Sequence, residues 1–269
     1  MLLVINIYPK SKIPNPKSKI KNQKSKIPLP PSIMNKGNLY LIPTPLGETG
    51  LEAGLPAYNM QILQNIDTFI VEELRTARRF LRKAGYDKDF ETVTFYLLNE
   101  HTPDDEVTGM LEKSLSGKHI GLLSEAGLPC IADPGNIAVR LAHRKGIRVI
   151  PLTGPSSIML ALMASGLNGQ NFVFHGYLPV KPDERAKALR ELENGASRNK
   201  QTQIFIETPY RNLQMLESIV KTCHPSLILC IAANLTLPTE WIRSMAISEW
   251  KRQKPELHKR PAVFLLGSW

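Results

Sequence analysis

The stretch SEAGLPCIADPG at residues 124–135 decides the fold, together with a second stretch, PLTGPSS, at residues 151–157. Each begins where an apolar run ends, Ile120–Leu123 before the first and Val149–Leu152 before the second. In an open α/β sheet, small ligands bind at loops that follow the carboxyl ends of strands. Glycine and proline in such loops expose backbone N–H and C=O groups in a rigid geometry. We therefore expect two loops from neighbouring strands to form a ligand pocket built mainly from main chain.

Around these loops, short β-branched runs alternate with amphipathic stretches, which is typical of α/β architecture. The strands expected in a first unit cover residues 39–43, 68–72, 92–98, 119–124 and 148–152. The helices expected between and after them lie near 57–65, 75–84, 104–115, 134–145 and 156–165. Asp133 is the expected N-cap of the fourth helix, with Pro134 as its first residue. Ser156 is a good N-cap for the fifth helix, and Gly166 is expected to end it.

A second unit follows, with its last three strands close together in the sequence, which predicts a mixed or antiparallel sheet. Its expected strands cover residues 171–176, 202–207, 227–233, 241–247 and 261–267, and its expected helices cover 182–193 and 209–222. The fold class is therefore α/β, with an N-terminal domain at 34–167, a C-terminal domain at 168–269 and a ligand cleft between them. The first sheet is expected to be mainly parallel and the second to be mixed.

Composition excludes several classes of protein. Hydrophobic residues make up 42% and charged residues 22% of the chain, which is ordinary for a soluble globular protein. No apolar run approaches the roughly 18–20 residues of a membrane span. The three cysteines form no C-x-x-C pair and the six histidines are scattered, so we expect reduced thiols in a cytoplasmic protein, no disulfide and no metal site.

The net charge of +10 depends on a leader at residues 1–33, which contains seven lysines and no arginine, aspartate or glutamate. Without these lysines the chain has 27 basic and 24 acidic residues, so net charge alone is poor support for nucleic-acid binding. Within the leader, Lys-Ser-Lys-Ile recurs every seven residues. This repeat suggests translated upstream DNA, with a disordered segment preceding a natural start at Met34. A basic tail for RNA or membrane and a targeting segment are the alternative interpretations.

Residues 38–269 resemble the tetrapyrrole methylase superfamily of S-adenosylmethionine-dependent methyltransferases. Within that superfamily they are most similar to the small-subunit ribosomal RNA (cytidine-2'-O)-methyltransferase branch. The motifs that carry the resemblance occur in the family's order: LYLIPTPLG at 39–47, VEELRT at 71–76, the two loops quoted above, FVFHGYLP at 172–179, Lys181, Arg185 and FIETPYR at 205–211. Any one of these motifs is weakly specific, whereas the ordered set is strongly specific.

The chain departs from the branch at positions that bear on the substrate. It has Glu72-Glu73-Leu74-Arg75 where the branch usually has Glu-Asp-Thr-Arg, and Glu125-Ala126-Gly127-Leu128-Pro129 where the branch has Asp-Ala-Gly-Thr-Pro. Glu48-Thr49 replaces the family's Asn-Leu, and His101-Thr102 replaces a His-Asn pair. These changes leave the cofactor motifs intact and leave the substrate open.

The resemblance implies that S-adenosylmethionine binds in the cleft between the domains, held mainly by backbone groups. The positions that match the family's cofactor site are Pro45, Leu46, Ala126, Gly127, Leu128, Ile131, Ser156, Ser157, Glu207 and Ala233. No metal is required, because the sulfonium already activates the methyl group and the enzyme chiefly aligns the reactants and excludes water. A homodimer is expected from the family.

Four arginines lie on one expected helical face, at Arg75, Arg78, Arg79 and Arg82, where they form either a solvated surface or a phosphate contact. Methylation of a ribose hydroxyl benefits from a base within hydrogen-bond reach, and Glu73 and His101 are the candidates. We therefore expect Glu73, Arg75 and His101 to be the catalytic residues. His101 is equally well explained as a loop residue before a helix.

Three functions fit these observations. The first is 2'-O-methylation of a ribose in small-subunit ribosomal RNA, which makes that RNA or subunit the expected partner. The second is methylation of a tetrapyrrole such as a corrin or porphyrin precursor, whose carboxylates also suit arginines. The third is a non-catalytic RNA- or nucleotide-binding protein that keeps the fold and lacks the base.

Overall fold

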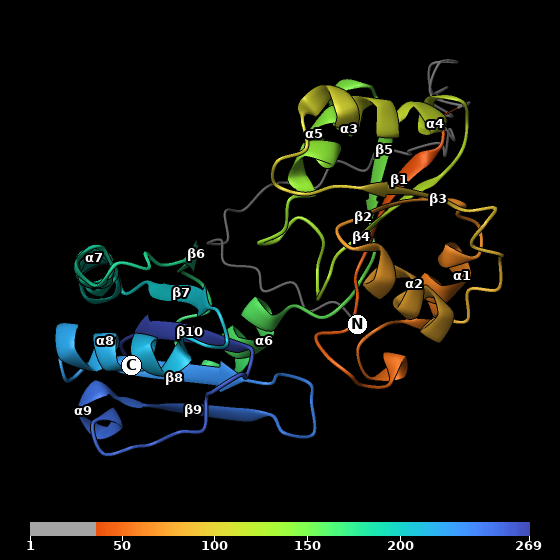
Figure 1. The fold of residues 1–269 in the computed structure, drawn as a ribbon. Helices are drawn as coiled ribbons and strands as arrows, with labels where there is room; N and C mark the ends of the chain where they lie inside the picture. Colours follow the sequence, from red (N-terminus) through yellow and green to blue (C-terminus); the bar gives the residue numbers. More distant parts are fainter. Residues whose placement is uncertain (1–35) are drawn as a thin grey trace, which may run out of the picture.

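The computed structural model describes residues 36–269, which form two α/β units joined by one crossing of the chain (Figure 1). The expected disordered leader at 1–33 and the expected start at Met34 lie outside the described residues. Each unit contains one five-stranded sheet. The expected α/β fold class is confirmed, and the division into domains at residue 167 stays a prediction.

The first sheet is entirely parallel, in the order β3-β2-β4-β1-β5. Its strands are β1 (Asn38–Ile42), β2 (Thr68–Val71), β3 (Thr94–Leu97), β4 (Ile120–Leu123) and β5 (Arg148–Pro151). The elements between them are a 3₁₀ turn η2 (Leu51–Ala53), α1 (Ala57–Leu63), α2 (Leu74–Lys83), α3 (Asp104–Met110), α4 (Glu112–Leu115) and α5 (Asn136–Arg144). Separate apolar clusters from α1 and α2 and from α3 and α5 cover the sheet, as buried parallel strands require.

The sequence led us to expect that the two glycine-proline loops follow neighbouring strands. In the structure they do not, because another strand separates β4 from β5. Strand β1 lies between β4 and β5, since Leu39 pairs with Ile120 on one side and with Val149 on the other. The loop after β1 therefore lies between the two glycine-proline loops. All three loops leave the same edge of the sheet, because the strands are parallel.

Two helix predictions in this unit need correction. Helix α5 begins at Asn136 with Gly135 as its N-cap, so the predicted cap at Asp133 is wrong. The Asp133 carboxylate instead accepts a hydrogen bond from the Gly135 N–H at 3.0 Å, which forms a local turn that delays the helix. The helix expected at 104–115 is divided at Leu111, where the Leu111 N–H turns back to the Thr108 carbonyl.

The second sheet is mixed, as predicted, in the order β6-β7-β10-β8-β9. Strands β6 and β7 are parallel and the other pairs are antiparallel. Its elements are β6 (Phe172–Tyr177), α7 (Pro182–Asn199), β7 (Thr202–Glu207), α8 (Asn212–Thr222), β8 (Ile228–Ala233), β9 (Trp241–Ala246), α9 (Ile247–Trp250) and β10 (Ala262–Gly267). Helix α7 continues through Asn199, beyond the predicted range, and α9 was not predicted.

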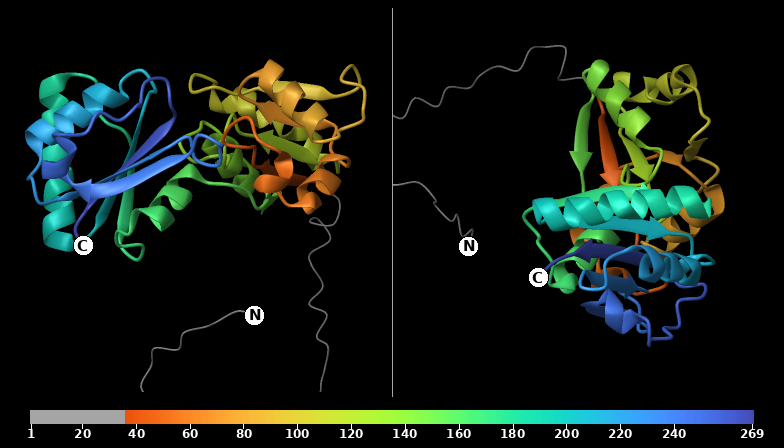
Figure 2. Two further views of the ribbon diagram at one scale, coloured as in Figure 1. Left: turned by 90° about the horizontal axis from the view of Figure 1, so that it is seen from below. Right: turned by 90° about the vertical axis from the view of Figure 1, so that its left-hand side faces the viewer.

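Helix α6 (Ser157–Ser165) links the two units. It follows β5 of the first sheet but packs on the second sheet, where Ile158, Ala161 and Leu162 join a buried cluster with strand residues such as Ile204 and Val263. Helices α7 and α8 cover the opposite face of that sheet. Figure 2 shows the two units side by side, with α6 in green reaching from one to the other. Ser156 caps the helix and Gly166 ends it in a left-handed conformation, as predicted.

The described part of the chain contains no helix with the length and apolar character needed to span a membrane. Its three cysteines, Cys130, Cys223 and Cys230, are free thiols. Within the same residues, no group of three or more metal-binding side chains occurs.

Candidate functional site

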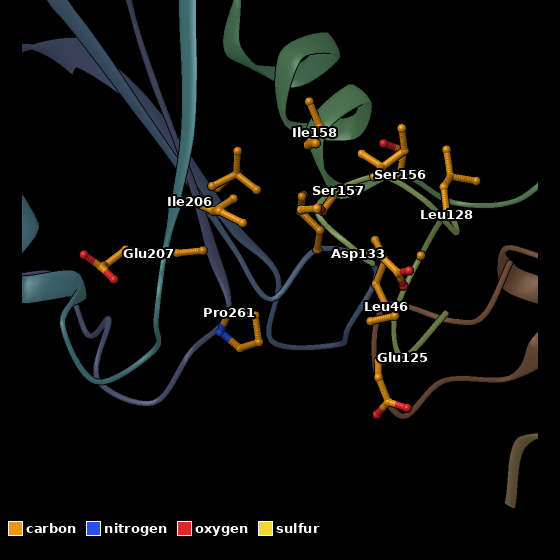
Figure 3. Close-up of a pocket in the computed structure, with 18 of the residues that line it drawn as sticks. Leu46, Glu125, Leu128, Asp133, Ser156, Ser157, Ile158, Ile206, Glu207 and Pro261 are labelled. Carbon is orange, nitrogen blue, oxygen red and sulfur yellow. The ribbon is translucent and has the colours of Figure 1, made fainter. Parts of the chain in front are cut away.

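A cavity of about 390 Å³ lies between the two units, within the size range of small-molecule sites (Figure 3). The first unit lines it with residues from the three strand-end loops, and the second unit lines it with the ends of its strands. The lining residues from the first unit and α6 are Leu46, Glu72, Glu125–Leu128, Ile131–Asp133 and Ser156–Ile158. Those from the second unit are Phe174, Tyr177, Ile206, Glu207, Pro209, Ala232, Asn234, Leu235, Leu237 and Pro261–Val263.

The loops after β1 and β4 are held together by a short backbone bridge. The Thr44 N–H donates to the Gly127 carbonyl at 3.0 Å, and the Gly127 N–H donates to the Thr44 carbonyl at 3.1 Å. The Ser124 hydroxyl also donates to the Gly127 carbonyl, at 2.7 Å. Gly127 adopts φ +79°, which glycine reaches without steric cost. This part of the cavity is therefore a preformed backbone surface.

Gly127→Ala should weaken ligand binding at this surface. A Cβ there would lie 3.0 Å from Leu46 Cδ2 and 3.3 Å from the Pro155 carbonyl oxygen, on a left-handed backbone. We expect the free energy of unfolding to fall by about 1–3 kcal/mol, and the affinity for S-adenosylhomocysteine, measured by calorimetry, to fall. Gly85→Ala is the matched control, since Gly85 has φ +75° and a Cβ added to it would have no neighbouring atom within 4 Å. Equal binding by both variants would contradict the expectation.

Several amide groups in the loop after β4 have no protein partner. Among the described residues, none accepts a hydrogen bond from the N–H of Ala126, Leu128 or Ile131. Two other residues of this loop, Cys130 and Ala132, hold left-handed backbone conformations, at φ 68° and 59°. Such conformations cost about 1 kcal/mol or more for a residue with a Cβ, and they concentrate at functional sites. The loop is therefore built to direct backbone donors toward a ligand.

Helix α6 adds a second set of donors. The Ser156 hydroxyl accepts the Met159 N–H at 3.4 Å, whereas the amides of Ser157 and Ile158, two residues that line the cavity, have no partner among the described residues. The positive end of the helix dipole favours an anionic or polar ligand group here. Ser156 and Ser157 both line the cavity, as the resemblance implied.

The second unit contributes a mainly apolar wall. Phe174 and Tyr177 flank a register shift in the pairing of β6 with β7, and Ile206 and Val263 come from the adjoining strands. The irregularity re-aims side chains at the cavity, as bulges near active sites do. Such a wall suits a flat ring system more than a charged group.

Glu207 borders the cavity with its backbone, whereas its carboxylate points away from the first unit (Figure 3). Glu207 Oε1 accepts hydrogen bonds from Arg211 Nη2 at 2.6 Å, Arg211 Nε at 3.0 Å and the Thr208 N–H at 2.6 Å. Glu207 Oε2 is buried and has no partner within the described residues. The side chain therefore fixes the start of α8.

Two other expected cofactor positions lie off the cavity. Pro45 lines a smaller neighbouring cavity, and its neighbour Leu46 reaches the main one. Ala233 packs in the core on the α7 and α8 side of the second sheet, while Ala232 lines the cavity. Successive side chains along β8 point to opposite faces of the sheet, so Ala232 points to the cavity face and Ala233 to the other. The other positions, namely Leu46, Ala126, Gly127, Leu128, Ile131, Ser156, Ser157 and the backbone of Glu207, come together around one space.

None of the expected catalytic residues, Glu73, Arg75 and His101, lines the cavity. The Glu73 carboxylate caps α2 by accepting the N–H groups of Arg75 and Thr76 at 2.8 and 2.7 Å, and these bonds lower its pKa. A carboxylate held in this way is a poor proton acceptor. The His101 side chain is 85% exposed, 3.5 Å from Glu100 Oε1. Arg75 is exposed in the first turn of α2.

Two carboxylates that line the cavity, Glu72 and Asp133, were not among the expected catalytic residues. Burial raises the pKa of Glu72, and the negative charges of Asp133, Glu125 and Glu100 raise it further. Burial also raises the pKa of Asp133, against the effect of its bond to the Gly135 N–H. Perturbed carboxyl groups in a cleft are typical of sites that move protons. The signal in the sequence was the position of Glu72 directly after an apolar strand.

Comparison with known proteins identifies the family of this scaffold. A profile described as Tetrapyrrole (Corrin/Porphyrin) Methylases matches residues 38–250. The chain belongs to this family. The expected family and its two-unit fold are thus confirmed, and the fold places a backbone-lined cavity between the units.

This tetrapyrrole methylase has relatives named ribosomal RNA small subunit methyltransferase I. The one from Escherichia coli O157:H7 is 32% identical over 235 residues, which cover 86% of this chain and 78% of that protein. The one from Vibrio cholerae serotype O1 is 32% identical over 234 residues, which cover 86% and 77%.

Solved structures resemble this tetrapyrrole methylase in fold. The methyltransferase CobJ superposes with a TM-score of 0.59 at 18% identity, covering 86% of this chain and 94% of that one. Uroporphyrin-III C-methyl transferase from Thermus thermophilus, complexed with S-adenosylhomocysteine, superposes with a TM-score of 0.53 at 15% identity, covering 86% and 97%.

Proposed function

We propose that this tetrapyrrole methylase transfers the methyl group of S-adenosylmethionine to a ribose 2'-hydroxyl of small-subunit ribosomal RNA. The observation that carries the proposal is a cavity lined by carboxyl groups of raised pKa and by residues whose amides have no partner among the described residues, in a chain that is 32% identical to proteins named for small-subunit ribosomal RNA methylation. The position of the hydroxyl on the ribose follows from the branch that the sequence resembles.

The residues of the cavity fit the cofactor. Unpaired amides of Ala126, Leu128 and Ile131 suit polar atoms of an adenosine, and the apolar wall that includes Ile206 and Val263 suits an adenine ring. The amides at the start of α6 suit the cofactor's carboxylate. When bound, S-adenosylmethionine supplies a methyl group already activated by a positive sulfonium.

The residues of the chain then have three tasks. The backbone loops orient the reactants, the apolar wall excludes water, and a carboxylate accepts the proton of the ribose hydroxyl. The ribose oxygen would take the methyl group from the bound donor, and the carboxylate would accept the proton that this hydroxyl loses. Glu72 is the proposed acceptor because it lines the cavity directly after β2 and because desolvation and neighbouring carboxylates raise its pKa above the ordinary value.

A tetrapyrrole substrate is the second candidate, supported by the structural neighbours. Against it, the carboxylates that line the cavity without a cationic partner are Glu72, Glu125 and Asp133, and none of its described lining residues is a lysine or an arginine. A tetrapyrrole rich in carboxylates would meet repulsion beside the methyl donor, whereas a ribose hydroxyl is neutral and donates to a carboxylate. This difference favours RNA.

Ribose-methylation mapping of small-subunit ribosomal RNA tests the proposal. RNA from a strain that lacks this chain should lose one or more 2'-O-methyl marks, and expression of the wild-type chain should restore them. An unchanged map would overturn the RNA assignment.

Binding of S-adenosylhomocysteine separates the methyltransferase proposals from a non-catalytic protein. At a ligand concentration 100 times Kd, binding stabilises the folded chain by about 2.7 kcal/mol, visible as a rise in Tm. No rise at millimolar ligand would contradict both methyltransferase assignments.

We also infer a cytoplasmic homodimer. The three free cysteines of the described residues support a reducing compartment, where thiols persist without forming disulfides. Exposed apolar side chains lie on and near α6, at Met159, Met163 and Trp269, and support a surface that a second copy of the chain covers. Sedimentation velocity of the full chain would give its oligomeric state.

A further inference from the structure

A second cavity, of about 180 Å³, opens beside the first and shares Leu46, Glu125 and Ala126 with it. Its walls are the loop after β1, α2 from Thr76 to its last residue Lys83, and the start of the loop after β4. Unlike the main cavity, it is lined by two cations, Arg79 and Lys83, together with the carboxylates of Glu48 and Glu125, of which Glu125 accepts a hydrogen bond from the Thr76 hydroxyl at 2.8 Å. We call it the basic cavity.

The cations of α2 divide between two surroundings: Arg78 and Arg82 share one face, as expected, whereas Arg79 lies with Lys83. The Arg82 guanidinium lies 3.9 Å from the centre of the Phe90 ring and donates to the carbonyls of Tyr86 and Lys88, and Arg78 lies over Phe90 and Phe95. These two arginines stabilise the first unit. Arg79 and Lys83 have no aromatic partner of this kind among the described residues, and they line the basic cavity.

Arg79 and Lys83 share one weak charged partner, Glu48, and Lys83 Nζ also donates a hydrogen bond to the Thr49 carbonyl at 2.5 Å. Arg79 Nη1 lies 3.9 Å from Glu48 Oε1, and Lys83 Nζ lies 3.8 Å from Glu48 Oε2. Direct charge-assisted hydrogen bonds are about 2.7–2.9 Å long, and the Glu48 side chain is 83% exposed. Exposed ion pairs of this kind contribute little to stability. Glu48 therefore occupies the position of an external anion and can leave it at small cost.

We propose that the basic cavity binds a backbone phosphate of the RNA substrate, next to the nucleotide whose ribose enters the main cavity, and that Glu48 competes with that phosphate. The proposal rests on the proposed function. An arginine and a lysine around one anion match a phosphodiester, because guanidinium and ammonium groups are the usual phosphate partners. The walls shared by the two cavities allow one strand to occupy both.

RNA-binding measurements on charge variants test the inference. The probe is a fluorescein-labelled single-stranded RNA of small-subunit sequence, about 20 nucleotides long to exceed a typical single-strand site size, followed by anisotropy at several salt concentrations. Arg79→Ala and Lys83→Ala should each weaken binding about 3- to 10-fold at low salt and reduce the slope of log K against log salt by about 0.7. Glu48→Gln should tighten binding several-fold, since it removes the competing charge.

Glu184→Gln is the matched control, because Glu184 pairs with the exposed Lys181 at 3.1 Å on α7, outside both cavities. It should leave RNA affinity unchanged. All four variants should bind S-adenosylhomocysteine as the wild type does, which shows that they are folded. A tightening by Glu48→Gln is hard to obtain from misfolding.

The outcomes separate this inference from the proposed function. If the wild type binds the RNA and the variants at Glu48, Arg79 and Lys83 bind it equally well, the phosphate site is wrong and the function stands. If the wild type binds S-adenosylhomocysteine but not RNA, both the RNA substrate and the phosphate site are wrong. If a polyglutamate peptide binds with the same dependence on these residues and RNA does not, the basic cavity binds acidic protein and the inference is overturned.

Discussion

Glu72→Gln should lower kcat for RNA methylation by about 10²- to 10⁴-fold, the range of a lost general base. Its amide keeps the shape of the side chain but cannot accept the ribose proton. Binding of S-adenosylhomocysteine should be unchanged, since the backbone loops hold the cofactor. Single-turnover methylation of small-subunit RNA with labelled methyl donor measures the effect.

The pH profile distinguishes a base from a structural residue. Activity of the wild type should rise with pH through the raised pKa of Glu72, because only the ionised carboxylate accepts a proton. Asp133→Asn removes one of the charges that raise this pKa, so the rising limb should move to lower pH. Glu72→Gln should lack the limb.

The free energy of unfolding should change with pH in the opposite direction from the activity. The folded-state pKa of Glu72 is above the ordinary value of 4.5, so protonation favours the folded chain at low pH and ionisation disfavours it as the pH rises. Glu72→Gln should therefore keep or raise Tm at neutral pH.

The adjacent Glu73→Gln is the matched control. It weakens the cap of α2, so it should lower Tm while leaving kcat within a few-fold of the wild type. A large loss of kcat in Glu73→Gln and none in Glu72→Gln would reverse the assignment.

Arg211→Ala should lower the free energy of unfolding by about 3–5 kcal/mol, the usual effect of removing one member of a buried ion pair. The Glu207 side chain is 1% exposed, and its Oε2 already lacks a partner among the described residues. Without Arg211, the buried charge keeps only the Thr208 N–H. Urea denaturation followed by circular dichroism measures the change.

Arg260→Ala is the control for this variant, because Arg260 pairs with Glu256 at the same i,i+4 spacing and 3.1 Å. Glu256 is 88% exposed, so the loss should be at most about 1 kcal/mol. Adding Glu207→Gln to Arg211→Ala should restore part of the stability, since it removes the uncompensated charge. Equal losses in Arg211→Ala and Arg260→Ala would show that burial of Glu207 is unimportant.

The sequence predicted the elements of both sheets closely, because their strands are apolar runs ended by clear turn residues. It did not predict the order of the strands, and so placed the two glycine-proline loops side by side although β1 separates them. Strand order depends on contacts between residues such as Leu39 and Val149 that are far apart in the chain. Local patterns carry no information about such contacts.

Most residues expected to bind the cofactor line the cavity, whereas the residues expected to be catalytic do not. Backbone loops with glycine are visible in the sequence, as Gly127 shows. Which of two adjacent glutamates faces the cavity depends on the exact end of β2: Glu72 leaves the strand toward the cavity, and Glu73 turns back to cap α2. For Ala232 and Ala233 the choice depends on which face of the second sheet receives α6.

The segment before α6, residues 153–155, is where the chain passes from the first unit to the second. The Thr153 carbonyl accepts a hydrogen bond from Asn59 Nδ2 at 2.8 Å, and a Cβ on Gly154 would lie 2.2 Å from Pro43 Cβ, so the segment is clamped to the first unit up to that point. Beyond Pro155, α6 packs on the second sheet. A ligand that touches the loop after β4 and the second sheet contacts both units and couples them mechanically. We expect ligand binding to make the two units open as a single cooperative unit. Amide hydrogen exchange should then be slower in both units than it is without ligand.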